Sequence, residues 1–511
     1  MFTLKNKLSL INFAFIVSIL NFIFFHYPFF KFVVNNIDYT SFGGIFIIIS
    51  LIVLMIVLNS LVFFLIFFLS SYVGKFLVSL FFIINSISVY FVNTYGVIID
   101  ESMIGNVLNT KYEESSSFFS LKLFVYILFL GVFPSIYFIK AKIENITLKK
   151  FSIISSLTLL FCLVLVFVNA SNWLWIDKNS KTLGGLAMPW SYTVNTSLFY
   201  IHKHKKNEKE ILLPNATIKD NKKSVVVLVI GESARSQNFS LYGYNKNTNP
   251  LLSKINNLFH FNAKSDATYT TAGVKSILEH KNTNDLYEIL PNYLYRNKVE
   301  VIWRTTNWGE PPVHIEKYQK RDVLKPQCKG KGCNYDEVLL VGLKEQILAS
   351  SKNKILIVLH TSTSHGPTYS KKYPPEFEKF KPVCNSVELG NCTQTELINA
   401  YDNTIVYTDY ILSKVIDELK QLKQFKSTMV FVSDHGESLG EKNLYMHGMP
   451  LSIAPKEQYE IPFIVWLSDN SSKKIKPSNN LTQNHVFHSV LNFLNLESPI
   501  YNEDVNIFLD N

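Results

Sequence analysis

The sequence predicts a chain in two parts, a membrane domain of five helices followed by an α/β domain with a mainly parallel sheet. The 511 residues are 48% hydrophobic and only 18% charged, which is unusual for a wholly soluble protein. Charged side chains are sparse before residue 170 and dense after it. The polar part is long enough to bury a core of its own. These observations exclude a disordered regulator, a small disulfide-linked protein and a coiled coil.

Five apolar runs in residues 1–170 predict the transmembrane helices, at 9–25, 44–69, 76–92, 123–139 and 151–168. Each run approaches or exceeds the roughly 17 residues that a helix needs to cross a bilayer. A cleaved secretory signal is the alternative for the first run, because Lys5 and Lys7 precede it, but no small-residue cleavage site follows.

Lysines near the predicted spans indicate the orientation of the chain. They gather at the N-terminus and after the second and fourth spans, at Lys5, Lys7, Lys75, Lys140, Lys142, Lys149 and Lys150. Cytoplasmic loops carry an excess of positive charge. We therefore expect the N-terminus in the cytoplasm and everything after the fifth span outside.

The cysteines agree with that orientation. Cys162 lies in the fifth apolar run and is interpreted as a small core residue. The other four form close pairs on the predicted outer side, Cys328 with Cys333 and Cys384 with Cys392, which favours disulfides in an oxidising compartment. A structural zinc site is the alternative, although neither pair has CxxC spacing.

The rest of the chain divides into a linker, residues 171–222, and a folded domain, residues 223–511. The linker is polar and rich in lysine from 203 to 222, which indicates a path along the membrane surface. The folded domain has strand-like runs at 225–230, 299–303, 355–359, 429–432 and 461–467, with helical patterns between them, as at 396–423. This alternation predicts the α/β class.

Three of these strands run directly into chemically active side chains. Glu232 follows the first strand, His360 and His365 follow the third, and Asp434 and His435 follow the fourth. Ligands bind outside the carboxyl ends of strands in such sheets, and this set supplies the oxygen and nitrogen ligands that zinc accepts. Taken singly, Asp434 is as well explained as a helix cap and Glu232 as a solvated loop residue.

A nucleophile is offered by the threonines of the 268–271 segment, which precede an apolar helix-like run. A threonine N-cap is the ordinary explanation. Coordination to a metal would lower the pKa of a bound hydroxyl, and the helix N-terminus favours a negatively charged phosphoryl group.

Four segments carry a resemblance to a known family: VVLVIGESARSQNFSLYGY from Val226, HTSTSHGPTY from His360, VCNSVELGNCTQTELINAYDNTI from Val383, and SDHGESLGEKNLYMHGMP from Ser433. They resemble the membrane-bound phosphoethanolamine transferases of Gram-negative bacteria, which include the lipid A modifying enzymes of polymyxin resistance. The resemblance implies an inner-membrane protein with five spans and a periplasmic sulfatase-like domain of the alkaline phosphatase superfamily.

The resemblance also implies roles for individual residues. Glu232, Asp434 and His435 would bind zinc, as one or two ions, together with the catalytic threonine. His365 and His447 match histidines that hold the phosphoryl group, act as acid or base, or bind a second zinc. Substrate contacts are implied for His360, Asn307, Asn106 and Glu114, the last two toward the donor lipid; an amphipathic interfacial helix is the alternative for their loop.

The chain departs from the family pattern near the nucleophile. Family members often bracket it with a disulfide, but no cysteine lies near Thr270. Alignment of the apolar helix makes Thr270 the nucleophile, whereas alignment of the Thr-Ala dipeptide makes it Thr271. A substrate-binding lysine of some relatives falls on Pro311 here.

The implied reaction moves phosphoethanolamine from phosphatidylethanolamine to lipid A, lipooligosaccharide or a core sugar, through a covalent threonine intermediate, with release of diacylglycerol. A phosphoglycerol transferase of the same superfamily and an inactive binding or signalling homologue are the alternatives. Membrane lipids are expected partners. Nucleic acid is not, because the net charge of +10 comes without any recognition motif.

Overall fold

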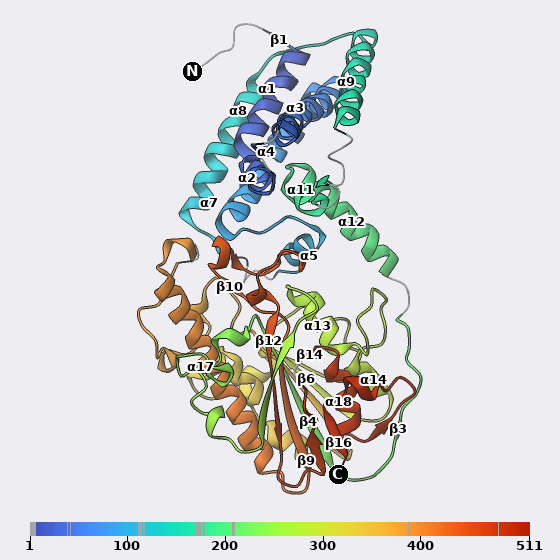
Figure 1. Ribbon diagram of the computed structural model, residues 1–511, viewed down its shortest axis with the longest axis vertical. Helices are drawn as coiled ribbons and strands as arrows, with labels where there is room; N and C mark the ends of the chain where they lie inside the picture. The colour runs from blue at the N-terminus through green and yellow to red at the C-terminus, as the bar shows by residue number, and fades with distance from the viewer. Residues whose placement is uncertain are drawn as a thin grey trace. The chain divides into compact units, whose positions relative to one another are not determined.

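The computed structural model describes residues 7–37, 39–40, 42–110, 115, 118–169, 175–176, 179–206, 210–386, 389–478 and 480–510. The chain divides into two units (Figure 1). The first comprises Met1–Thr110 and Phe119–His202, and the second comprises Lys111–Phe118 and Lys203–Asn511.

The first unit consists mainly of long apolar helices. Four stretches are long and apolar enough to cross a membrane: α3 (Phe42–Leu69), α4 (Ser71–Tyr95), Leu121–Lys140 and α9 (Leu148–Val168). The third of these joins α7 (Leu121–Tyr126) to α8 (Phe133–Lys140) through a π-helical stretch, Ile127–Val132. Among the described residues, these four stretches correspond to the second to fifth predicted spans.

The first predicted span, residues 9–25, corresponds to one helix that is followed by a sharp bend. Helices α1 (Leu10–Phe25) and α2 (Tyr27–Asn36) meet at His26 with a bend of 64° and give a fifth span only if they are counted together. Pro28 lies at the start of α2, where its missing N–H is tolerated and where it could not continue α1 without loss of a helical hydrogen bond.

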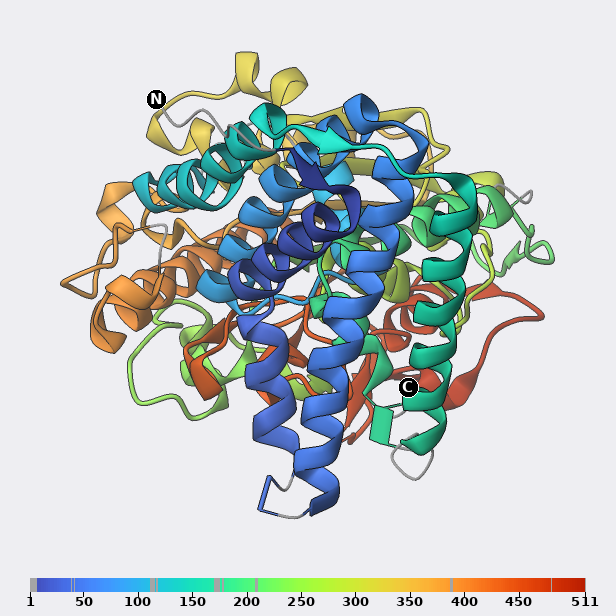
Figure 2. The same cartoon turned by 90° about the horizontal axis from the view of Figure 1, so that it is seen from above.

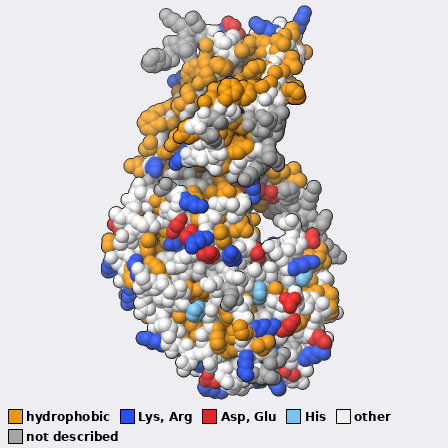
Figure 3. Space-filling model, in the orientation of Figure 1, with side chains coloured by type: hydrophobic (Ala, Val, Ile, Leu, Met, Phe, Trp, Pro, Cys, Tyr) orange, Lys and Arg blue, Asp and Glu red, His pale blue; other side chains and the backbone are white. Residues whose placement is uncertain are grey.

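Helix packing buries a few polar side chains inside this unit. Helix α1 packs against α3 and α4, and α9 packs along α3 (Figure 2). Asn85 of α4 donates to Asn21 of α1 at 2.8 Å and accepts from Tyr192 at 2.9 Å. Hydrophobic side chains cover much of the face of this unit that Figure 3 shows, which suits a lipid environment.

Part of the predicted linker is helical. Helices α11 (Ser180–Leu186) and α12 (Trp190–Lys206) fall within residues 171–222, and the first unit continues through them as far as His202. Tyr192 of α12 supplies one of the buried hydrogen bonds described above. The linker boundary at residue 171 stays a prediction, and the first compact unit continues to His202.

The second unit contains an eight-stranded sheet in the order β14-β5-β12-β9-β4-β8-β6-β7. All five predicted strands are present, as β4 (Ser224–Gly231), β6 (Glu300–Thr305), β8 (Lys354–His360), β9 (Lys426–Ser433) and β12 (Glu460–Leu467). The first four are parallel, but β12 runs antiparallel to β9 and to β5 (Leu258–Lys264). Short edge strands β7 (Lys317–Lys320) and β14 (Leu481–Thr482) complete the sheet.

Helices cover both faces of this sheet, which explains why its central strands are continuously apolar. Val226, Leu228 and Ile230 of β4 belong to one core with α13 (Thr270–Leu278), α14 (Leu290–Arg296) and α18 (His485–Phe493). Helix α17 (Gln394–Lys420) packs on the other side of the sheet, against β9 (Figure 1). A capping box formed by Thr393 and Glu396 starts α17.

The cysteine predictions are confirmed. Cys328 pairs with Cys333 and Cys384 pairs with Cys392 in disulfides, and Cys162 is free and buried. The four disulfide-bonded cysteines are therefore not available as ligands of the alternative structural zinc site.

Candidate active site

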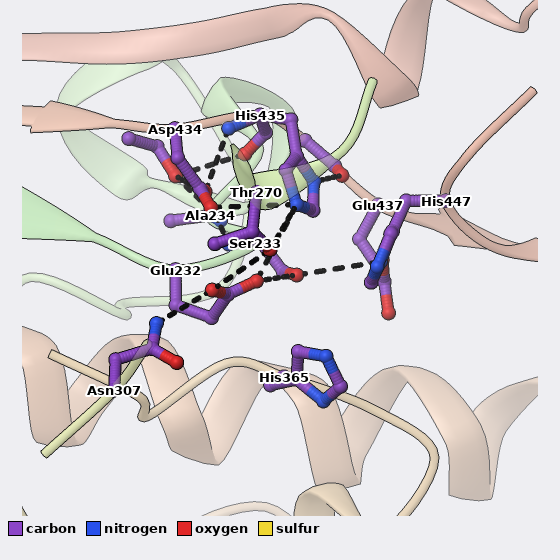
Figure 4. A network of polar contacts seen from close by, with 12 residues as sticks. Glu232, Ser233, Ala234, Thr270, Asn307, His365, Asp434, His435, Glu437 and His447 are labelled. Atoms are coloured by element: carbon purple, nitrogen blue, oxygen red, sulfur yellow. Dashed lines mark hydrogen bonds and ion pairs between the residues drawn. The ribbon is translucent and has the colours of Figure 1, made fainter. Parts of the chain in front are cut away.

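A buried polar cluster lies at the carboxyl ends of the central strands (Figure 4). Glu232 and Ser233 follow β4, and Asp434 and His435 follow β9. Because β4 and β9 are parallel neighbours with Gly231 opposite Ser433, their ends bring these residues together. Thr270, the first residue of α13, completes the cluster and is 4% exposed.

The atoms of this cluster converge on His435 Nε2. That nitrogen lies 3.3 Å from Thr270 Oγ1, 3.4 Å from Glu232 Oε1 and 3.4 Å from Asp434 Oδ2. Thr270 Oγ1 is also 3.3 Å from Glu232 Oε2. Glu232, Asp434 and His435 form a group whose ligand atoms all lie within 4.8 Å of one another.

The hydrogen bonds around the cluster leave its ligand atoms directed inward. His435 Nδ1 lies 2.8 Å from the Gly436 carbonyl oxygen, so Nδ1 carries a proton and Nε2 is directed toward the cluster. Asp434 Oδ1 accepts from the N–H groups of Ser233 and His435, whereas Oδ2 makes no hydrogen bond among the described residues. A divalent cation fits this donor set, because it would satisfy the buried Oδ2.

The pKa values of the two carboxyl groups also favour a bound cation in this cluster. Burial raises the pKa of Asp434, and the nearby Glu232 carboxylate raises it further. Burial opposes ionisation of Glu232 as well, but the positive charges of the surrounding histidines hold the pKa of Glu232 below its usual range. Two buried carboxylates this close resist joint ionisation unless a cation lies between them.

The position of the hydroxyl group separates the two candidate nucleophiles. Thr270 Oγ1 points into the cluster, and Thr271 makes no hydrogen bond to it among the described residues. The extended N-cap is Tyr269, so Thr270 occupies the first helical position and is not the side-chain cap that an ordinary threonine would supply.

Gly273 lets α13 approach the cluster. A Cβ on this residue would lie 2.2 Å from the carbonyl oxygen of Asp434 and 2.7 Å from its carbonyl carbon. These are backbone atoms that cannot rotate away.

We expect Gly273→Ala to lower the free energy of unfolding by about 1–3 kcal/mol, because α13 must move away from Asp434. Thermal or denaturant unfolding measures this. Gly390→Ala is the matched control, since its new Cβ would come no closer than 3.8 Å to another side chain of the described residues. Equal free energies of unfolding for both variants and the parent would contradict the close contact between Gly273 and Asp434.

His365 and His447 lie beside the cluster. The His447 ring is centred 4.2 Å from that of His435 and 5.3 Å from that of His365. Figure 4 places His365 across from Glu232, with its ring toward the same space. The predicted histidines are therefore brought together with the predicted metal ligands.

Two residues of this site have no role predicted from the sequence. Glu437 is fully buried, and its Oε2 lies in hydrogen-bond contact with His447 Nδ1 at 2.6 Å; burial raises the pKa of Glu437 to about 8. Ser233 donates to Glu232 Oε1 at 2.7 Å from a backbone with φ of 53°, a sparsely populated conformation for a serine. Glu437 lies two residues after His435 in the sequence, and this short spacing could have indicated that Glu437 belongs to the same site.

The remaining predicted residues differ in their placement. Asn307 Nδ2 donates to Glu232 Oε2 at 2.7 Å, so it joins the cluster directly. His360 is fully buried, with Nδ1 3.5 Å from Glu310 Oε2, and makes no hydrogen bond to the cluster among the described residues. Asn106 lies in α5 (Glu101–Asn109) of the first unit. Glu114 lies outside the described residues, and the substrate contacts of these residues stay predictions.

Comparison with known proteins covers both units. Residues 54–204 match the family model described as phosphoethanolamine transferase EptA/EptB, and residues 224–496 match the sulfatase family model. Phosphoethanolamine transferase EptA of Helicobacter pylori is 40% identical over 504 residues, which is 96% of this chain and 95% of the relative. EptA of Escherichia coli is 32% identical over 462 residues, 83% of each chain.

A solved structure shares the whole architecture. The integral membrane lipooligosaccharide phosphoethanolamine transferase A of Neisseria meningitidis superposes with a TM-score of 0.86 at 26% identity and covers 98% of both chains. The periplasmic domain of EptC from Campylobacter jejuni is 35% identical with a TM-score of 0.52, over 58% of this chain and 97% of that domain. A membrane domain followed by a sulfatase-like domain is thus confirmed.

Proposed function

The chain belongs to the phosphoethanolamine transferase family, and from this premise we propose that it transfers phosphoethanolamine from phosphatidylethanolamine to lipopolysaccharide through a covalent intermediate on Thr270. One observation carries the proposal: the Thr270 hydroxyl lies 3.3 Å from both Glu232 Oε2 and His435 Nε2, in a buried set of metal-ligand groups. The relative from Neisseria meningitidis is named for lipooligosaccharide, which supports lipid A or a core sugar as the acceptor.

Glu232, Asp434 and His435, together with Thr270, would hold the zinc ion. Zinc bound there would lower the pKa of the threonine hydroxyl and would place a positive charge beside the transferred group. His435, Glu437 and His447 form a second group of potential ligands, which would allow a second ion.

In the first half of the reaction, Thr270 Oγ1 attacks the phosphorus of phosphatidylethanolamine. The new bond joins Oγ1 to phosphorus, and the bond between phosphorus and the glycerol oxygen breaks. His365 and His447 handle the protons: this pair accepts the proton of Thr270 and returns one to the leaving oxygen, so that neutral diacylglycerol departs. The Glu437 side chain fixes the orientation of the His447 ring through its 2.6 Å contact.

In the second half, an acceptor oxygen on lipopolysaccharide attacks the same phosphorus. The bond from phosphorus to Thr270 Oγ1 breaks, the acceptor proton passes to the histidine pair, and Thr270 regains its proton. Asn307, which donates to Glu232 at 2.7 Å, would hold that carboxylate in place and contact the transferred group.

We place the protein in the bacterial inner membrane with five spans in residues 1–170, a linker within 171–222 and the catalytic domain, 223–511, in the periplasm. The lysine distribution and the two disulfides support this orientation. Membrane anchoring confines the enzyme to the leaflet that holds its lipid substrates. The loop with Asn106 and Glu114 would contact the donor lipid.

The test is an intact-mass measurement of the full chain in detergent after incubation with phosphatidylethanolamine, followed by peptide mapping. We expect a phosphoethanolamine adduct on Thr270 and release of diacylglycerol. A glycerophosphate adduct from phosphatidylglycerol would identify a phosphoglycerol transferase. A zinc-loaded protein that forms neither adduct would favour the binding-only alternative.

A further inference from the structure

Asp336 is a buried carboxylate, 2% exposed, that follows the Cys328–Cys333 disulfide. It accepts four hydrogen bonds. Ser362 donates through its N–H at 2.9 Å and its hydroxyl at 3.2 Å, and the hydroxyls of Thr306 and Thr363 donate as well. Both carboxylate oxygens are therefore fully used.

The donors belong to the two loops that follow β6 and β8. Thr306 directly precedes Asn307, and Thr363 lies two residues before His365. The two loops also bond to each other, because Thr306 N–H donates to the His360 carbonyl at 3.1 Å and Asn307 Nδ2 donates to the Thr361 carbonyl at 2.9 Å. Asp336 thus joins, from a third segment, the two loops that carry Asn307 and His365.

The segment around Asp336 is hydrogen-bonded to a helix and to a strand of the domain. The next residue, Glu337, donates its N–H to the Tyr407 hydroxyl of α17 at 3.0 Å. Arg304 of β6 donates to the Leu339 carbonyl at 2.6 Å. The segment that carries Asp336 is therefore bonded to a helix and to a strand, neither of which belongs to the two loops.

We infer that Asp336 is a positioning residue of the transferase, which sets the places of Asn307 and His365 by binding the loops before them. The inference rests on the proposed function for the reaction that it affects. A charged, buried acceptor makes strong hydrogen bonds, and an amide in its place keeps only one of the two oxygens that the four donors use. Misplacement of a reacting group by about 1 Å can cost about a hundredfold in rate.

The experiment compares Asp336→Asn with Asp409→Asn in the full chain. Asp409 is the matched control, because it is equally buried and accepts from the N–H groups of Leu251 and Leu252 at 2.9 and 3.0 Å, with no hydrogen bond to the site among the described residues. Each variant is examined by thermal unfolding, zinc content, hydrogen exchange and transfer kinetics.

We expect Asp336→Asn to keep zinc, to speed hydrogen exchange across 361–368, and to lower kcat by about ten- to a hundredfold. Asp409→Asn should lose similar stability but keep kcat within about threefold. Equal kcat losses in the two variants, or unchanged exchange at 361–368 in Asp336→Asn, would overturn the inference.

A mutant cycle tests whether Asp336 affects the rate through Asn307 and His365. In an Asn307→Ala, His365→Ala background, Asp336→Asn should cost no more than about twofold, because the groups that it positions are gone. A full additional loss would overturn the inference. If Asp336→Asn does not fold, Thr363→Val removes one of the four hydrogen bonds and should speed exchange over the same peptide.

The exchange measurement does not depend on the reaction. A parent protein that lacks transfer would refute the proposed function and leave hydrogen exchange to decide whether Asp336 holds the loops. A parent that transfers phosphoethanolamine, with Asp336→Asn as active as Asp409→Asn, would refute the positioning role alone.

Discussion

Replacement of Thr270 by alanine is expected to lower phosphoethanolamine transfer by about four orders of magnitude or more, because the variant has no oxygen to form the covalent intermediate. The hydroxyl that is removed is the one held 3.3 Å from Glu232 and from His435. Diacylglycerol release from phosphatidylethanolamine and the intact mass of the protein both report the loss.

Thr271→Ala is the matched control for this prediction. It removes a neighbouring hydroxyl on the same helical turn, and Thr271 makes no hydrogen bond to the cluster among the described residues. We expect transfer within about threefold of the parent, as for a substitution outside the reacting groups. Thr270→Ser should still form the adduct. An active Thr270→Ala variant, or an adduct that disappears only in Thr271→Ala, would reassign the nucleophile.

Asp434→Asn is expected to abolish stoichiometric zinc binding and to lower transfer by about a thousandfold or more, since it replaces a charged ligand by a neutral amide of similar size. Metal analysis after dialysis measures the first effect. Zinc should stabilise the parent by about 4 kcal/mol at a thousand times its Kd and should leave the variant unchanged.

The metal-free proteins should show the opposite order of stability. Burial and Glu232 raise the pKa of Asp434, so ionisation of this residue at neutral pH destabilises the folded state when no cation is bound. The contribution of Asp434 to the free energy of unfolding is therefore favourable at low pH and is lost as the pH rises through the pKa of Asp434 in the folded state. Metal-free Asp434→Asn should therefore unfold at or above the temperature of the metal-free parent. Asp409→Asn, which should keep zinc, controls for loss of a buried carboxylate.

Local sequence was enough to predict the elements whose signal is continuous along the chain. Apolar runs such as Phe42–Leu69 indicate a membrane helix by length alone, and the buried strand Ser224–Gly231 is recognisable because both of its faces are covered. The cluster of Glu232, Asp434 and His435 was predictable for a related reason: these residues follow parallel strands, whose carboxyl ends meet at one edge of the sheet.

Other features depend on contacts between distant segments, and only the tertiary structure decided them. The antiparallel course of β12 depends on pairing with β5 and β9, which its composition does not encode. Thr270 and Thr271 are neighbours in sequence, and only the tertiary structure shows that the Thr270 hydroxyl lies 3.3 Å from His435 Nε2. Asp336 holds Thr306 and Ser362 from a segment that carries no motif for that role. The physical reason is that pairing, helix approach and hydrogen-bond partners are set by packing across the whole domain, whereas hydrophobic periodicity is a property of neighbouring residues.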